Sequence, residues 1–256
     1  MIPKKIHYCW FGENPMPELA LRCIESWKKH CGDYEIIEWN EKTFDVSSNL
    51  YVKQAYDAKK YAFVTDYVRL YALYTQGGVY MDTDVMVLKS IDPFLGNRAF
   101  SGFECKDKVP TGIMASEKGS PIVAAFLKYY DTAKFIKDDG TYDTTTNCET
   151  ITDIMTAKGL ILNGKKQTVE SFTFYPQNVF CPDHKKLNDK EYMRDTVTIH
   201  YFAGSWRSEK ARARGEKWWW GITAHTATAV SKALKKMFGE KWLTVRNKLR
   251  DKFLSD

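Results

Sequence analysis

Gly77-Gly78-Val79-Tyr80-Met81-Asp82-Thr83-Asp84-Val85 is the stretch that decides the fold, because it places two carboxylates one residue apart directly after a short apolar run. The β-branched, aromatic and apolar residues at 79–81 are typical of a buried strand, and residues 85–88 continue the same pattern. The acidic pair is therefore predicted to interrupt a core strand.

The two carboxylates, Asp82 and Asp84, repel each other and are costly to remove from water, so a cation is expected between them. A divalent metal is the usual solution, and carboxylate oxygens suit Mg²⁺ or Mn²⁺. These ions take few protein ligands and complete their coordination with water and substrate phosphates. The pair thus predicts a manganese or magnesium site that binds a diphosphate.

Two other interpretations of the pair stay open at this point. Asp-x-Asp is short enough to arise by chance and can form a solvated turn between hairpin strands. It is also the nucleophile and acid of haloacid-dehalogenase phosphohydrolases, which need a later acidic pair after an apolar strand. The only candidate for that later pair, Asp138-Asp139, follows Lys137 in a polar loop.

The first forty residues predict an α/β domain with a parallel sheet. An aromatic-rich strand over 6–11 is followed by a helix over 18–30, whose apolar residues recur at helical spacing, and by a second strand over 34–39. Ligands of such sheets bind beyond the carboxyl ends of the strands. The aromatic and amide side chains there are candidates to stack on or pair with a nucleotide base, although any of these aromatics can equally close the core; they are Tyr8, Trp10, Trp39 and Asn40.

Residues 61–76 predict a helix, because aromatic and apolar residues repeat at intervals of three and four and Gly77 follows. Asp66 and Arg69 lie three residues apart and therefore on one face. The helix leads directly into the acidic pair, which places these two side chains near the predicted diphosphate and its sugar.

The runs 62–69 and 77–84 together resemble the DxD-containing sugar-binding region of glycosyltransferase family 32, in particular its bacterial capsular-polysaccharide members. The opening run at 2–12 and the segment 34–40 are also similar to those members. The resemblance extends from Ile2 to about Trp206. It implies a GT-A (Rossmann-like) α/β fold and metal-dependent, retaining transfer from a nucleotide sugar.

The resemblance also implies roles for individual residues. Asp82 would contact the donor ribose and the metal, and Asp84 would be the direct metal ligand. Asp66 and Arg69 match positions that hold the hydroxyls of the donor sugar, and Tyr80 matches the strand residue behind them. Trp10 would lie near the base.

The segment Thr198–Trp206 holds the predicted third metal ligand. A lone histidine in an apolar run is more often a core residue, but the acidic pair lacks a third protein ligand, and family members close this site with a C-terminal segment of this kind. We therefore expect His200 to contact metal or diphosphate and Ser205 and Trp206 to contact phosphate. Related enzymes vary between His and Asn in this segment.

The C-terminal segment 207–256 differs in composition from the rest. It carries 13 Lys and Arg against 5 Asp and Glu, whereas the whole chain has a net charge of +6. Tryptophans at 218–220 and an amphipathic pattern from Trp242 to Phe253 accompany these charges. This predicts a basic helical extension that binds an anionic membrane or packs on the catalytic domain; nucleic-acid binding is disfavoured because no recognised motif appears.

Composition limits the remaining possibilities. A chain of 256 residues with 44% hydrophobic content is expected to form one core, here a catalytic domain at 1–206 with the extension at 207–256. No signal peptide or membrane span is expected, which predicts a cytoplasmic protein, peripheral on the inner face of the cell membrane. The six cysteines have no zinc-ligand spacing and are expected to be free thiols.

The sequence as a whole predicts a hexosyltransferase that moves a sugar from a nucleotide sugar, UDP-linked in preference to GDP-linked, to a saccharide acceptor. The acceptor would be a lipid-linked oligosaccharide of surface or capsular polysaccharide synthesis. The alternatives are a metal-dependent phosphohydrolase and a catalytically silent protein that binds sugar or membrane.

Overall fold

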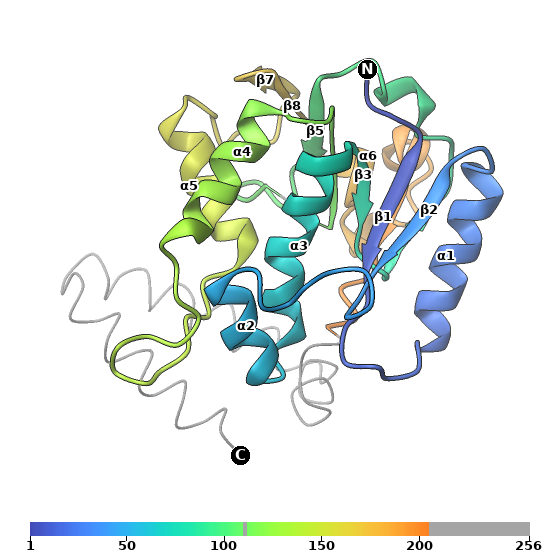
Figure 1. Cartoon of the computed structure of the whole chain (residues 1–256). Helices are drawn as coiled ribbons and strands as arrows, with labels where there is room; N and C mark the ends of the chain where they lie inside the picture. The colour runs from blue at the N-terminus through green and yellow to red at the C-terminus, as the bar shows by residue number, and fades with distance from the viewer. Residues whose placement is uncertain (110–111, 205–256) are drawn as a thin grey trace. The chain divides into compact units, whose positions relative to one another are not determined.

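The computed structural model describes residues 1–109 and 112–204 (Figure 1). Residues Met1–Ala203 form one compact unit. The predicted extension at 207–256 lies outside the described residues, and no helix among those described is long and apolar enough to cross a membrane.

A seven-stranded sheet runs through this unit in the order β2-β1-β3-β6-β5-β8-β7. A separate two-stranded sheet pairs β4 with β9. The strands are β1 (Lys5–Cys9), β2 (Glu35–Trp39), β3 (Gly78–Met81), β4 (Val85–Val87), β5 (Ala99–Gly102), β6 (Ile113–Ser116), β7 (Gln167–Val169), β8 (Phe172–Tyr175) and β9 (Thr198–His200).

The α/β fold predicted from the sequence is confirmed, but the sheet is mixed and not parallel throughout. Strands β2, β1 and β3 are parallel, as the first forty residues predict, whereas β6 runs antiparallel to both β3 and β5. The expectation that the acidic pair interrupts one core strand is wrong. Strand β3 belongs to the large sheet and β4 to the small one, so the pair lies where the chain leaves one sheet for the other.

Two layers of helices cover the large sheet (Figure 1). Helices α2, α3, α4 and α5 contribute to the core cluster on one face, and α1, α6 and the small sheet contribute to the cluster on the other. The helices are α1 (Glu18–His30), α2 (Leu50–Asp57), α3 (Tyr61–Gln76), α4 (Pro121–Lys128), α5 (Asn147–Ala157) and α6 (Gln177–Phe180). Short 3₁₀ turns lie at Asp92–Phe94, Tyr129–Asp131, His184–Lys186 and Tyr192–Asp195.

Helix α3 positions the site, and its bounds are those that the sequence predicts. Gly77 ends it with a φ of 69°, and Gly78 follows with a φ of 114°, so both glycines adopt backbone conformations that other residues rarely take. This sharp reversal sends the chain directly from α3 into β3. As a result, the side chains of α3 lie close to the residues that follow β3.

All six cysteines among the described residues are free thiols, as expected. Cys9, Cys23, Cys31 and Cys181 are buried, and Cys105 and Cys148 are partly exposed.

Candidate functional site

The acidic pair lies in a tight turn between β3 and β4. The backbone N–H of Asp82 donates to the carbonyl of Gly112 over 2.7 Å, and the N–H of Val85 donates to the carbonyl of Asp82 over 3.0 Å. These bonds hold the turn against the chain that enters β6. Both carboxylates are therefore fixed at the carboxyl end of β3, where ligands of α/β sheets bind.

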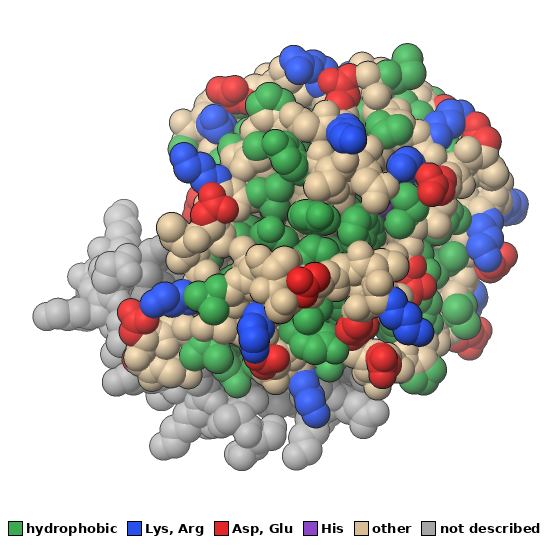
Figure 2. Space-filling view, viewed as in Figure 1, with side chains coloured by type: hydrophobic (Ala, Val, Ile, Leu, Met, Phe, Trp, Pro, Cys, Tyr) green, Lys and Arg blue, Asp and Glu red, His purple; other side chains and the backbone are tan. Residues whose placement is uncertain are grey.

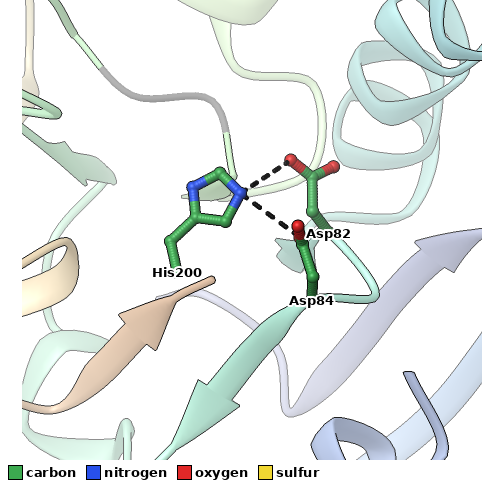
Figure 3. Close-up of side chains that lie close together, drawn as sticks. All are labelled: Asp82, Asp84 and His200. Atoms are coloured by element: carbon green, nitrogen blue, oxygen red, sulfur yellow. Dashed lines mark ion pairs between the residues drawn. The ribbon is translucent and has the colours of Figure 1, made fainter. Parts of the chain in front are cut away.

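The structure brings His200 to this pair from far along the chain. His200 lies opposite Val85 in the antiparallel ladder of β4 and β9. Its Nε2 is 3.2 Å from Oδ1 of Asp84 and 4.0 Å from Oδ2 of Asp82 (Figure 3). One ligand atom from each of the three residues lies within 4.8 Å of the others, which is the arrangement of a three-ligand metal site.

Asp84 is fixed by the chain that follows β9. The N–H of Ala203 donates to Oδ2 of Asp84 over 2.8 Å, and the N–H of Tyr201 donates to the backbone carbonyl of Asp84 over 3.0 Å. The segment after His200 therefore wraps the turn, so that the histidine and the carboxylate hold each other in place.

Asp82 is held from the other side by Arg69 of α3. Nη2 of Arg69 is 3.2 Å from Oδ1 of Asp82 and 3.3 Å from Oδ1 of Asp66, and the guanidinium lies over the ring of Tyr80, 4.6 Å from its centroid. The Tyr80 hydroxyl also donates to Oδ1 of Asp82 over 2.8 Å. The four residues predicted for the donor sugar thus form one buried cluster that touches the predicted metal site.

The pKa values of the two carboxylates of the turn shift in opposite directions. Burial raises the pKa of Asp82, although the Arg69 charge opposes the shift. Burial acts in the same direction on Asp84, but the hydrogen bond to His200, the charge of His200 and the hydrogen bond from the N–H of Ala203 together outweigh it and lower the pKa of Asp84. Burial alone would lower the pKa of His200, and the hydrogen bond to Asp84 with the charges of both carboxylates raises it to about 10.

Each carboxylate of the turn also has a basic side chain of the protein beside it. Arg69 neutralises Asp82 and the imidazolium of His200 neutralises Asp84. A divalent metal would replace the proton of His200, because a metal-bound imidazole is neutral.

The donor set fits a hard or borderline divalent metal. Two carboxylates and one imidazole suit Mn²⁺ or Mg²⁺ better than soft metals, and three protein ligands leave positions for phosphate oxygens. A Cβ added at Gly112 would lie 2.8 Å from Nδ1 of His200 and 3.4 Å from Oδ2 of Asp82, so the bare backbone at Gly112 forms one wall of the site. Nδ1 of His200 is buried and has no hydrogen-bond partner in the described structure.

Asp66 has further partners that the sequence did not reveal. The side-chain N–H₂ of Asn147, at the start of α5, donates to the backbone carbonyl of Asp66 and to the hydroxyl of Tyr130, each over 3.0 Å. Burial raises the pKa of Asp66 to about 7, against the lowering effect of Arg69. No local sequence pattern predicts that Asn147 or Tyr130 lies near Asp66, since both residue types are common at helix ends.

The four predicted base contacts are close in pairs, since Tyr8 and Asn40 both donate to Glu38 and the backbone N–H of Trp10 donates to the carbonyl of Trp39, but the Trp39 side chain lies apart from the others. Tyr8 packs edge-on against Trp27 and donates to Glu38, and Trp39 belongs to the core cluster on the opposite face of the sheet. The indole of Trp10 donates to the carbonyl of Asn14 over 2.6 Å and stays partly exposed.

Asn40 bonds to Glu38 and caps the following turn. A base contact by these residues stays a prediction. Ser205 and Trp206, predicted at the phosphates, lie outside the described residues.

The acidic pair that a phosphohydrolase of the haloacid-dehalogenase type would need is not built into the core. Asp138 is 91% exposed and pairs with Lys134 on the surface, and Asp139 caps its own loop through Thr141. This candidate pair therefore does not provide the second carboxylate site that the phosphohydrolase alternative requires.

Comparison with known proteins agrees with the geometry of the site. A family model described as "Glycosyltransferase sugar-binding region containing DXD motif" matches residues 17–101, about a third of the chain. The match includes Asp66, Arg69, Tyr80 and the acidic pair.

A curated relative is inositol phosphoceramide mannosyltransferase 3 of Schizosaccharomyces pombe, which is 29% identical over 131 residues. The alignment covers 50% of this chain and 36% of the relative, so this chain spans about a third of the relative's length. The similarity to a bacterial capsular enzyme is not among these findings.

Two solved structures are similar to parts of the chain at low identity. The PaToxG glycosyltransferase is 17% identical with a TM-score of 0.45, and the match covers 62% of this chain and 69% of that one. A glycosyltransferase involved in glycosylation of the major capsid of PBCV-1 is 12% identical with a TM-score of 0.47, covering 83% of this chain and 98% of that one.

Proposed function

We propose that the chain is a metal-dependent GT-A glycosyltransferase that moves a hexose from a nucleotide sugar to a saccharide acceptor. The observation that carries the proposal is the continuous cluster that joins the triad Asp82, Asp84 and His200 to the buried pair Arg69 and Asp66. The match of residues 17–101 to the sugar-binding region with a DXD motif supports the same activity.

Different residues of the chain would bind the diphosphate and the sugar of the donor. The triad would hold Mn²⁺ or Mg²⁺, which neutralises the charge that develops on a nucleoside diphosphate as it leaves. Asp66 would accept hydrogen bonds from hydroxyls of the donor sugar, and Arg69 fixes Asp66 relative to Asp82 through its two ion pairs. Tyr80 supports both groups through its hydroxyl and its ring.

Several finer features belong to the proposal. The donor is UDP-linked in preference to GDP-linked, and transfer proceeds with retention of the anomeric configuration, as the resemblance to glycosyltransferase family 32 implies. The acceptor is a saccharide, lipid-linked as in surface polysaccharide synthesis. The basic segment at 207–256 attaches the enzyme to the inner face of an anionic membrane.

The first test is thermal stabilisation by a panel of UDP- and GDP-sugars, with and without Mn²⁺, for the wild type and Asp84→Asn. A ligand that binds only the folded protein must raise the melting temperature. We expect a manganese-dependent rise with UDP compounds that the variant loses. Absence of any rise across the panel in the wild type would refute the donor site.

A second test addresses the chemistry directly. Proton NMR of the first product formed from a UDP-hexose shows whether the anomeric configuration is retained. An inverted product would contradict the retaining mechanism while leaving the donor site intact. Release of inorganic phosphate from simple phosphoesters would instead favour a hydrolase.

A further inference from the structure

A second pocket, separate from the triad, lies on the face of the large sheet that α3 covers. It has a volume of about 540 Å³, and its lining includes four aromatic side chains, which we call the aromatic platform: Trp39 and Phe44, each only 6% exposed, and the more exposed Tyr67 and Tyr71. Figure 2 shows hydrophobic side chains gathered over α3, in the middle of the face in view. None of the pocket's residues belongs to the triad or to the cluster of Arg69. A volume of this size is within the range of small-molecule sites.

The platform is built from α3 and the loop that follows β2. Tyr67 and Tyr71 lie one helical turn apart with their rings nearly parallel, 6.3 Å between centroids. Phe44 and Trp39 both meet Tyr71 edge-on, at 5.3 and 5.8 Å. The indole N–H of Trp39 is already used by His7, so Trp39 offers the pocket an apolar surface.

Polar groups surround the aromatic platform. The hydroxyls of Tyr67 and Tyr71 have no side-chain or backbone partner in the part of the chain that the structure describes, and both side chains are partly exposed. The hydroxyls of Thr43 and Ser48 in the loop already donate to the backbone carbonyls of Glu38 and Asp45 and have only acceptor capacity left. Gln76 adds an amide whose oxygen accepts from Lys5 over 3.0 Å. The pocket therefore combines flat aromatic rings with hydroxyl and amide groups at its rim.

The charge of the residues that line the pocket disfavours anionic ligands. Asp45 is its single charged residue, and no lysine or arginine lines the pocket. A phosphate would be repelled by the Asp45 carboxylate and would meet no cation among the lining residues, while Lys5, which bonds to Gln76, is already paired with Glu35. A neutral ligand with one apolar face and several hydroxyls satisfies both the rings and the rim, and this is the chemistry of a pyranose sugar.

We propose that the pocket is a secondary binding site for a neutral saccharide. In this site one sugar face lies against the aromatic platform, and sugar hydroxyls bond to Tyr67, Tyr71 and Asp45. That the occupant is part of the acceptor chain rests on the proposed function, whereas saccharide binding at the pocket does not. The pocket would hold an acceptor chain at a distance from the acidic pair.

The test is saturation-transfer difference NMR on the full chain without metal or nucleotide. The probes are methyl α-mannoside, methyl β-galactoside, cellobiose and α-mannobiose, with UDP as a phosphate-bearing comparison. We expect transfer to at least one saccharide, strongest at the protons of one ring face. The double change Tyr67→Phe and Tyr71→Phe keeps both rings and should weaken binding by about thirtyfold, since two hydrogen bonds are lost at roughly 1 kcal/mol each.

Tyr71→Ala removes the centre of the platform and should abolish the signal. Tyr74→Ala is the matched control, because Tyr74 lies on the same helix, is exposed and does not line the pocket. Thermal melts show that each variant folds. Asp84→Asn should bind saccharide like the wild type, which separates this proposal from the donor site.

Three results would overturn the inference. The first is the absence of transfer to any of the four saccharides. The second is equal binding by the wild type and Tyr71→Ala. The third is a UDP signal that Tyr71→Ala loses, which would make the pocket a nucleotide-base site.

Discussion

Arg69 and Asp82 form a buried ion pair that joins helix α3 to the turn after β3. The two atoms, Nη2 and Oδ1, are 3.2 Å apart, and the Arg69 side chain is only 6% exposed. The same guanidinium holds Asp66, so one cation serves two carboxylates. Removing it leaves both carboxylates buried without their counter-charge, which is far costlier than loss of a surface pair.

Arg69→Met should therefore destabilise the protein by about 3–5 kcal/mol near neutral pH, the usual cost of breaking a buried pair. Burial already raises the pKa of Asp66 and of Asp82, and losing Arg69 raises both further. Because the folded state of Arg69→Met then binds more protons than its unfolded state, the loss in free energy of unfolding relative to the wild type should become smaller as the pH falls toward 5. Urea denaturation at pH 7.5 and pH 5 measures both effects.

Arg98→Met is the matched control. Arg98 pairs with Glu117 at 3.4 Å, but its side chain is 65% exposed. Its loss should change the free energy of unfolding by less than about 1 kcal/mol, as is typical of surface pairs. Equal destabilisation by the two variants would contradict the central role of Arg69.

His7 links three elements through a neutral imidazole. Its Nε2 lies 2.8 Å from the carbonyl of Gly77, which can only accept, so Nε2 carries the proton and Nδ1 accepts from the indole of Trp39 over 3.1 Å. Burial lowers the pKa of His7 to about 4. In the unfolded chain the imidazole of His7 is protonated as the pH falls through 6.5, whereas in the folded chain it is protonated only near pH 4.

The stability that His7 contributes should be complete above pH 6.5 and decline as the pH falls to about 4, by roughly 3 kcal/mol in total. His7→Gln should flatten the stability curve over this interval. His30→Gln, a change at the partly exposed last residue of α1, should leave this decline in place. Parallel curves for His7→Gln and the wild type would show that His7 does not cause the decline.

Gly78 is required by both its backbone conformation and its neighbours. Its φ is 114°, and an added Cβ would lie 2.8 Å from the carbonyl oxygen of Lys5 on the adjacent strand. Gly78→Ala should therefore cost more than the 1 kcal/mol or so of backbone strain alone. Gly140→Ala measures the cost of backbone strain without steric overlap, because Gly140 has a φ of 78° but open space around it.

Chemical denaturation of both variants gives the comparison. We expect Gly78→Ala to be less stable than Gly140→Ala by about 1–3 kcal/mol, the usual cost of overpacking. A smaller loss for Gly78→Ala than for Gly140→Ala would mean that β1 and β3 can separate without cost.

Local patterns account for the parts of the site that lie close together in the chain. The repeat of apolar residues in α3 and the glycines after it predict a helix whose Asp66 and Arg69 share a face beside Asp82. The structure has the same helix bounds and the predicted pair. These features depend only on helical periodicity and the conformational freedom of glycine.

Contacts between distant segments have no such signal. The pairing of β4 with β9 brings His200 to the acidic pair, and the resemblance to a family, not a local pattern, pointed to it. Strand alternation also separates neighbours, because Tyr8 and Trp39 end adjacent parallel strands but face opposite sides of the sheet. Asn147, at the start of α5, donates to the backbone carbonyl of Asp66 and to the hydroxyl of Tyr130, and periodicity does not specify these contacts.

His200→Gln tests whether the triad binds metal. Removing one of three protein ligands should lower the affinity for Mn²⁺ by more than about tenfold, since even changes to outer partners of metal ligands cost 10–100-fold. Electron paramagnetic resonance of free Mn²⁺ in titrations of the protein measures this without substrate. His30→Gln, at the partly exposed last residue of α1, should bind Mn²⁺ like the wild type. Unchanged affinity in His200→Gln would leave the acidic pair as the only protein ligands, and His200 would then serve to neutralise Asp84, from which its Nε2 is 3.2 Å away.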